Sequence, residues 1–263
     1  MPFGLSLDMT LGSTALSKGV LAKTPISILG ASLLAWWTAD RADLITLNGS
    51  AVTSWKDVMH GYDAVQGVSA SRPVYSATSF NGSPGLTFDG SDDGLICTDA
   101  ALLGLLPDAA EAGEMWAIVQ QDALAEVASS RNILSYGGTG ISTQRRIRRV
   151  VASGVNRGRF TVGTGASSLA ATDTSVNFNS RHVIRGAADA DSIDLSVDAA
   201  TPISISGVPA TSSAIACTIG SSSNTTATEF WHGKIRDVII TAGTLSPDQV
   251  TALNAWALPR RRL

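Results

Sequence analysis

The chain is poor in cysteine and in charged residues, and each shortage excludes a class of protein. Two cysteines in 263 residues are too few for a disulfide-stapled fold. Cys97 and Cys217 are predicted to be free buried thiols, with a disulfide between them as the alternative. Charged residues make up 16% of the chain and its net charge is −3, so no nucleic-acid partner is expected. No apolar run reaches the roughly eighteen residues of a membrane span, which argues against membrane insertion.

The N-terminal segment lacks the features of an export signal. Residues 1–7 contain no basic residue, Asp8 interrupts the first apolar stretch, and Lys18 and Lys23 interrupt the next. The chain is therefore expected to fold in the cytosol where it is made. Residues 1–30 are apolar without any periodicity, which predicts an arm that needs a covering surface, such as a partner subunit.

Short β-rich runs separated by turn residues make up most of the remaining sequence. Such runs without intervening helices are typical of an antiparallel sandwich or barrel. The runs lie at 33–37, 51–55, 62–66, 85–88, 94–97, 115–120, 131–136, 145–151, 158–162, 181–187, 192–197, 214–220 and 234–242. Asn48-Gly49 and Asn81-Gly82 predict tight turns, since both residue types tolerate positive φ.

Two segments favour helix. The first, at 100–106, is predicted to form one or two turns. The second begins with SPDQ at 246–249, which places Ser at the N-cap, Pro at the first helical position and Gln where a capping box requires it. The apolar residues Val250, Leu253 and Ala257 follow at helical spacing. Arg260 to Arg262 are expected to end the chain as a solvated basic tip.

Three segments, taken in order, carry a family resemblance. The first joins WWTAD at 36–40 to VTSWKD at 52–57. The second runs from RP at 72–73 to NGSPGLTFDGSDD at 81–93, and the third is FWHGKIRDVII at 230–240. Together they resemble the concanavalin A-like, laminin G-type jelly-roll domains found in bacterial surface proteins and phage virion proteins.

The resemblance covers about residues 33–258 and implies an all-β fold: an antiparallel two-sheet jelly-roll β-sandwich with a short C-terminal helix. Residues 1–30 would form an extended anchoring arm and residues 31–263 the jelly-roll domain. Independently of the family, Trp37 and Trp55 are large enough to fill the space of about 10 Å between two packed sheets.

The sequence offers one candidate metal site. Asp89, Asp92 and Asp93 cluster on a single loop, and calcium prefers several oxygen ligands of this kind. Related domains often bind calcium, so calcium is the cofactor considered. The alternative is that these carboxylates only cap turns through hydrogen bonds to backbone amides.

A cluster of arginines is the one concentrated charge feature. Strand alternation places Arg146 and Arg148 on one face and Arg145 and Arg149 on the other. Guanidinium groups suit the carboxylate, sulfate or phosphate groups of acidic polysaccharides, which makes Arg146 and Arg148 candidate ligand-binding residues. The alternative is an edge hairpin that its charges protect from aggregation.

Aromatic residues supply a second set of ligand-binding candidates. If exposed, Trp116 and Trp231 could stack on sugar rings. Catalytic patterns are missing by comparison: no strand pairs two acids in the way that retaining glycosidases require, and no serine-hydrolase elbow occurs. The sequence therefore predicts a protein that is not an enzyme.

These observations together predict a phage or phage-like virion surface protein, assembled in the host cytoplasm and located on the head or tail. Its arm would contact other virion subunits, and its lectin-like jelly roll would contact host-surface glycan or protein. A symmetric trimer is the homo-oligomer considered. The alternatives are a bacterial carbohydrate-binding surface protein and, third, a polysaccharide-degrading enzyme.

Overall fold

The structure is a computed structural model that describes residues 23–122, 130–175, 177, 180–222 and 229–262. Residues 1–22, most of the predicted arm, lie outside the described residues. The folded domain begins before residue 31, because helix α1 (Pro25–Leu29) contacts helix α3 (Pro247–Arg260) and Leu29 is buried. Thr24 caps α1 through a reciprocal pair of hydrogen bonds with Ser27.

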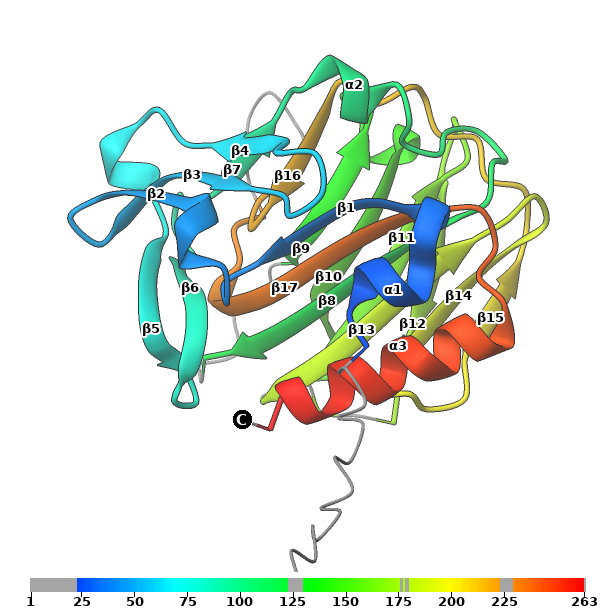
Figure 1. Cartoon of the computed structure of the whole chain (residues 1–263). Helices are drawn as coiled ribbons and strands as arrows, with labels where there is room; N and C mark the ends of the chain where they lie inside the picture. Colours follow the sequence, from blue (N-terminus) through cyan, green and yellow to red (C-terminus); the bar gives the residue numbers. More distant parts are fainter. Residues whose placement is uncertain (1–22, 123–129, 176, 178–179, 223–228, 263) are drawn as a thin grey trace, which may run out of the picture.

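The described residues form a mostly β domain, and its strand pairs are antiparallel (Figure 1). The strands are β1 (Leu33–Thr38), β2 (Ile45–Asn48), β3 (Ala51–Lys56), β4 (Asp63–Val65), β5 (Val74–Phe80), β6 (Ser83–Asp89), β7 (Leu95–Cys97), β8 (Gly113–Gln121), β9 (Arg131–Gly137), β10 (Gln144–Ala152), β11 (Val155–Gly163), β12 (Ser168–Thr172), β13 (Arg181–Ala188), β14 (Ser192–Val197), β15 (Ile203–Ser206), β16 (Ala216–Ile219) and β17 (His232–Ala242). The other helical segments are α2 (Ala100–Leu103) and the 3₁₀ turns η1 (Gly30–Ser32), η2 (Ala42–Leu44), η3 (Ser69–Ser71) and η4 (Ile141–Thr143). None of the helices among these residues has the length and hydrophobicity to span a membrane.

The strand prediction is confirmed for every β-rich run, since each run overlaps a strand of the structure. Four strands were not predicted: β2, β5, β12 and β15. They are short or half-exposed, and β5 (VYSATSF) mixes serine and threonine with its apolar residues. The predicted turn at Asn81-Gly82 is present, with positive φ at both residues.

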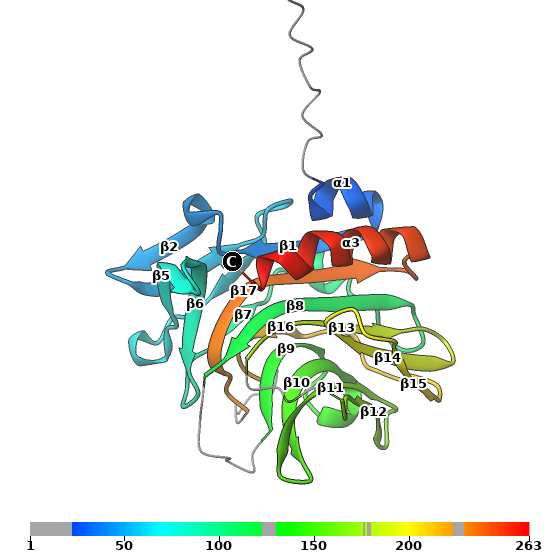
Figure 2. The ribbon, with the colours of Figure 1, turned by 90° about the horizontal axis from the view of Figure 1, so that it is seen from below.

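The strands form two layers that are linked into one sheet. One layer has the order β15-β14-β13-β8-β17-β1, and the other has the order β12-β11-β10-β9-β16-β7-β4-β3-β2. Strand β6 pairs with β17 and β5, and β5 pairs with β3, so hydrogen bonds connect the layers at one end. Figure 2 shows the first layer lying over the curved second layer. The result is a nearly closed antiparallel sheet, and the predicted two-sheet jelly roll is not confirmed in that finer detail.

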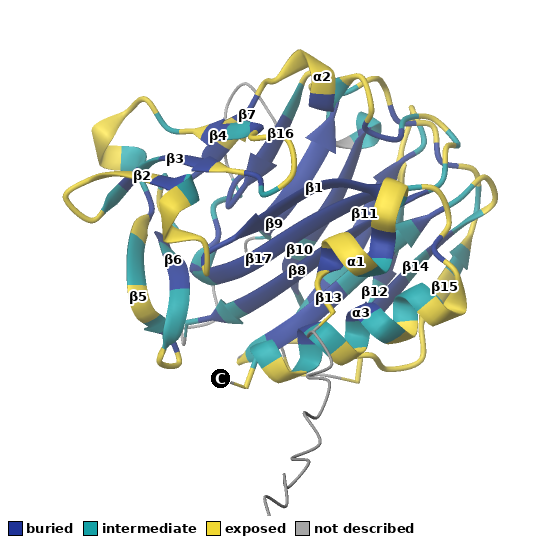
Figure 3. Cartoon of the chain, in the orientation of Figure 1, coloured by how far each residue is buried: buried dark blue, intermediate teal, exposed yellow. Residues whose placement is uncertain are grey.

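The main core lies between the two layers (Figure 3). Trp37 and Trp55 are fully buried there, as predicted. Their indole nitrogens donate to the backbone oxygens of Tyr62 and Thr38, which removes the cost of burying an unpaired N–H. Cys97 and Cys217 also face this core as directly opposed residues of β7 and β16, and both are free and buried.

Helix α3 covers the outer face of the first layer. Ser246 and Gln249 form the predicted capping box, and Leu253 and Ala257 are buried. Leu253 and Ala257 belong to a second apolar cluster, separate from the main core, which also contains Trp36. The Trp36 ring meets the Trp256 ring edge to face at a centroid separation of 5.7 Å. The periodicity of the sequence therefore placed the helix and its apolar face correctly.

The predicted solvated basic tip is wrong for Arg260, which ends α3 in a largely buried ion-pair network, whereas Arg262 is exposed. Its guanidinium donates to both carboxylate oxygens of Asp237, with its Nε and Nη2 atoms at 2.9–3.0 Å, and it also pairs with Asp40 at 2.7 Å. Asp237 is 1% exposed and also accepts a hydrogen bond from the indole nitrogen of Trp36. Burial alone would lower the pKa of Arg260, but the charges of Asp237 and Asp40 raise it above its ordinary value.

Removing the charge of Asp237 should destabilise the protein. We expect Asp237→Asn to lower the free energy of unfolding by about 3 kcal/mol, because Arg260 would lose its buried partner. Urea denaturation followed by tryptophan fluorescence measures this loss. Asp43→Asn is the matched control, since the Arg41–Asp43 pair is exposed and its loss should leave the midpoint unchanged. Equal midpoints for Asp237→Asn and the unmodified protein would contradict a stabilising role for the network.

Candidate functional site

The arginine-rich strand β10 lies in the middle of the second layer, between β9 and β11. The alternative of a charged edge hairpin is therefore wrong. Ile147 points into the core, and strand alternation directs its neighbours Arg146 and Arg148 to the opposite face. Arg159 of β11 lies directly opposite Arg148 across the strand pair, so it shares that face.

Glu229 joins these arginines, although no local sequence pattern pointed to it. The Nη1 atom of Arg146 lies 3.0 Å from one carboxylate oxygen of Glu229, and that of Arg148 lies 3.3 Å from the other. The Arg146 side chain is 1% exposed, whereas those of Arg148 and Glu229 are 12% and 21% exposed. Arg146, Arg148, Arg159 and Glu229 are called the arginine site below.

Positive charge dominates the arginine site. The pKa of Arg148 is lowered to about 10, because burial and the charges of Arg146 and Arg159 disfavour its charged form and Glu229 offsets only part of their effect. Burial also lowers the pKa of Arg146. The Nε atoms of Arg146 and Arg148 are buried without a hydrogen-bond partner in the described part of the chain. Buried guanidinium groups in this condition favour an added anion.

The side chains that surround the arginine site on this face are polar, and they are buried. On β9, the side-chain amide of Asn132 donates to Ser135, whose hydroxyl lies 2.7 Å from that of Thr218 on β16. Thr161 lies opposite Arg146 on β11. The side-chain oxygens of Asn132 and Thr161 are buried and have no partner among the described residues. This face therefore offers hydrogen-bonding groups beside the guanidinium groups.

Trp116 and Trp231 are both buried, so the exposure that sugar stacking requires is missing and their proposed ligand-binding role is not supported. Trp116 is 2% exposed beneath α3, and its indole nitrogen donates to Glu114 at 2.9 Å. Trp231 is fully buried in the core between the layers. Neither ring is therefore available to stack on a sugar. The sequence pattern of a strand identifies its apolar residues but does not show which outer face of the sheet a helix covers.

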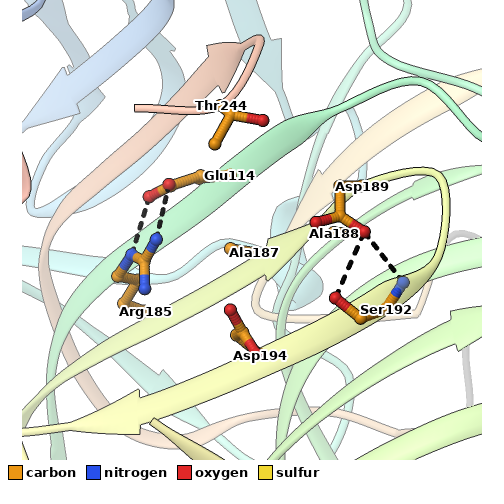
Figure 4. A pocket seen from close by; sticks show the side chains of 8 residues that line it. All are labelled: Glu114, Arg185, Ala187, Ala188, Asp189, Ser192, Asp194 and Thr244. Carbon is orange, nitrogen blue, oxygen red and sulfur yellow. Dashed lines mark hydrogen bonds and ion pairs between the residues drawn. The ribbon is translucent and has the colours of Figure 1, made fainter. Parts of the chain in front are cut away.

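A small pocket at the end of β8, β13 and β14 contains several carboxylates (Figure 4). Glu114 accepts two hydrogen bonds from Arg185, at 2.8 and 2.6 Å, and Asp189 accepts hydrogen bonds from Ser192. These partners occupy the carboxylates, and the pocket volume is about 40 Å³. Such a space holds water rather than a sugar ring.

The three aspartates of the predicted metal site do come together. One ligand oxygen from each of Asp89, Asp92 and Asp93 lies within 4.8 Å of the others. The turn-capping bonds of the alternative are also present: Asp89 accepts from the amides of Ser91 and Asp92, and Asp93 accepts from the amide of Asp89. The pKa of Asp93 is raised to about 6, chiefly by burial and also by the charges of Asp89 and Asp92, whereas the hydrogen bond from the Asp89 amide acts to lower it. Calcium binding at this loop stays a prediction.

Comparison with known proteins shows the fold. No protein-family model and no curated protein matches the chain. An arabinofuranosidase solved with arabinofuranosyl-α-1,2-xylobiose matches 91% of this chain at a TM-score of 0.64 and 12% identity. Domain 4 of the arabinanase AbnA from Geobacillus stearothermophilus, solved with arabinotriose, matches 86% of this chain and 98% of its own at a TM-score of 0.54 and 15% identity. The CBM40 of the Ruminococcus gnavus IT-sialidase, bound to α2,3 sialyllactose, matches 65% of this chain and 95% of its own at a TM-score of 0.51 and 13% identity.

The likeness to the arabinofuranosidase contradicts the expectation that the chain is not an enzyme, because that enzyme contains this fold. The expectation that the chain is not an enzyme rested on missing catalytic motifs. Such motifs do not report residues that the fold brings together from distant segments. The chain spans 65% of the arabinofuranosidase. At 12–16% identity, these likenesses concern the fold alone.

The raised pKa of Asp93 predicts a pH-dependent stability. The folded chain binds the Asp93 proton more tightly than the unfolded chain, whose aspartates titrate near pH 3.9. Protonated Asp93 therefore contributes to the free energy of unfolding below about pH 4, and this contribution is lost as pH rises through about 6. In the presence of a chelator, Asp93→Asn should therefore be more stable than the unmodified protein above about pH 6 and equally stable below about pH 4. Urea midpoints measured across this range test the difference, with Asp108→Asn, a half-buried aspartate outside the loop, as the control. Parallel curves for all three proteins would exclude the effect.

Proposed function

We propose that this domain binds anionic glycans at the arginine site. The observation that carries the proposal is the imbalance of charge around Arg148. The cations Arg146 and Arg159 lie near it, and Glu229 is the anion that offsets them. Arg146 is nearly fully buried and holds Glu229 in place. Arg148 and Arg159 are more exposed and would pair with a carboxylate or sulfate of the sugar.

A sugar hydroxyl can find a partner beside the guanidinium groups, because Glu229 has accessible carboxylate surface and can accept from a hydroxyl. Structures of similar fold that were solved with arabinotriose and with sialyllactose support a glycan ligand. Sialyllactose carries a carboxylate, which is the group that the arginine site is suited to accept.

The family resemblance extends this proposal to a biological setting. The domain would act on the surface of a phage or phage-like particle and contact host-surface glycan, with residues 1–22 contributing to attachment to other virion subunits. A bacterial carbohydrate-binding surface protein is the alternative setting. The sequence resemblance is the support for the particle role, and the charge imbalance supports glycan binding in either setting.

We also propose calcium as a structural ligand of the Asp89, Asp92 and Asp93 loop. The support is the approach of the three carboxylates to within 4.8 Å, which is the kind of oxygen cluster that calcium takes. A bound cation would offset the mutual repulsion of these carboxylates.

Glycan binding is tested with sialyllactose and a uronic-acid oligosaccharide, using lactose as the neutral control ligand. We expect both acidic sugars to bind and Arg148→Gln to weaken binding by about tenfold to a hundredfold, because a charge-assisted hydrogen bond is lost. Isothermal titration calorimetry at two salt concentrations measures the change, and affinity should fall at the higher salt concentration.

Arg41→Gln is the matched control variant, since Arg41 is an exposed arginine that pairs only with Asp43 among the described residues. It should bind as the unmodified protein does. Equal affinity for lactose and sialyllactose, or unchanged affinity in Arg148→Gln, would contradict the arginine site as the place of binding.

Calcium binding is expected to raise the thermal midpoint at neutral pH and to lose this effect as pH falls through about 6, because Asp93 must release its proton to act as a ligand. Differential scanning calorimetry with calcium, magnesium or chelator measures the shift. Asp92→Asn should abolish it, whereas Asp108→Asn should not. A calcium shift of the same size in Asp92→Asn would place the ion elsewhere.

A further inference from the structure

Three side chains outside the arginine site form a continuous hydrogen-bonded series. The hydroxyl of Ser180 lies 3.2 Å from Nε2 of His182, and Nδ1 of the same imidazole lies 2.8 Å from a carboxylate oxygen of Asp198. Because an ionised carboxylate only accepts hydrogen bonds, Nδ1 of His182 carries a proton and donates to Asp198. In the tautomer with a single proton at Nδ1, Nε2 can accept a hydrogen bond. The hydroxyl of Ser180 is then the donor to His182.

The fold fixes each member of this series. Ser180 precedes β13 and is exposed, while His182 is the second residue of β13 and is 3% exposed. Asp198 follows β14 at a positive φ of 56°, a conformation that aspartate tolerates in tight turns. Its second carboxylate oxygen accepts from the amide of Val183 at 2.9 Å, so the carboxylate is held against the imidazole from the backbone.

Asp198 stays ionised in this position. Burial acts to raise the pKa of Asp198, but hydrogen bonds from His182 and from the Val183 amide, together with the charges of His182 and Arg261, lower it below its ordinary value. Arg261 also forms an ion pair with this carboxylate. An ionised partner at Nδ1 stabilises the imidazolium that forms when Nε2 takes a proton.

Ser180 lines a cavity of about 500 Å³ that is large enough for a small ligand. The side chains around it are polar throughout, including Asn81, Gln120, Gln121 and Arg181. The Nη1 atom of Arg181 is buried and has no hydrogen-bond partner among the residues described. The cavity thus presents unused donor capacity beside an exposed serine hydroxyl.

We propose that Ser180, His182 and Asp198 form a hydrolytic triad that cleaves small carboxylic esters of polar alcohols. This activity goes beyond the proposed glycan binding and does not depend on it. Ser180 is the nucleophile, His182 the general base and acid, and Asp198 a positioning residue. The cavity lining excludes long fatty acyl groups, since it lacks apolar side chains to cover them, and it suits an acetyl ester on a hydrophilic alcohol such as a sugar.

The reaction balances without a cofactor. The Ser180 oxygen attacks the ester carbonyl carbon while its proton passes to Nε2 of His182, and Arg181 and the lining amides donate to the negative oxygen that forms. The carbon–oxygen bond to the alcohol then breaks, and the alcohol leaves with the proton from His182. Water, deprotonated by His182, attacks the acyl-serine and releases the carboxylic acid, and the proton returns to Ser180.

The first experiment measures hydrolysis of p-nitrophenyl acetate by the full chain at mildly alkaline pH. We expect a burst of nitrophenol followed by steady turnover, and a loss of about a hundredfold or more in kcat for Ser180→Ala and for His182→Asn. Ser213→Ala is the matched control, because Ser213 is likewise an exposed serine, and its hydroxyl donates to a carboxylate, that of Asp108, rather than to an imidazole. Asp198→Asn should lower kcat with little change in KM, and its thermal midpoint is measured alongside.

A second measurement keeps the proposal testable if a variant fails to fold. Diisopropyl fluorophosphate is incubated with the unmodified chain, and the labelled residue is located by peptide mass spectrometry. Labelling of Ser180 with loss of the burst is the expected result. Unchanged turnover in Ser180→Ala, or labelling at another residue with Ser180 unmodified, would overturn the triad and leave His182 with a purely structural role.

Discussion

The hydrogen bonds of strand β17 are the constraint on which the rest of the structure depends. This strand pairs with β1, β8 and β6 and so joins the first layer to the hairpin that leads to the second layer. It also carries Asp237, whose buried carboxylate binds Arg260 and Trp36 and thereby attaches α3 to the sheet. Because a buried carboxylate is costly without partners, helix, strand and ion pair must form together.

The two candidate sites use charge and hydrogen bonding in opposite ways. The arginine site keeps positive charge that Glu229 only partly neutralises, and this surplus is what makes an anionic ligand favourable. In the Ser180 series each polar group has its partner, and Asp198 receives hydrogen bonds and charge enough to stay ionised. One site is poised to bind a charge, and the other to move a proton.

The sequence predicted the β-rich runs and the capped helix well, because both depend on local signals. Short β-rich runs bounded by turn residues indicated the strands, and Ser246 with Gln249 indicated the start of α3. The site was only partly predictable. Arg146 and Arg148 follow from alternation along one strand, whereas Glu229 reaches them from 81 to 83 residues away, and no local pattern reports such a contact.

The errors have the same physical origin. Trp116 looks like any strand aromatic until α3 is laid over it, and the burial of Arg260 depends on Asp237 in another element. His182 and Asp198 lie 16 residues apart and meet only because β13 and β14 form a hairpin with a left-handed turn at its end. Tertiary neighbours, which one sequence does not disclose, decide each of these cases.

The opposed cysteines of β7 and β16 give the protein a chemical reporter of its own motions. Burial raises the pKa of both thiols, so they resist becoming the reactive thiolates that alkylating reagents attack. Modification therefore has to wait until β7 and β16 separate and admit water. The rate at which a thiol reagent labels Cys97 and Cys217 would thus measure how often β7 and β16 separate in the native protein, without any added probe.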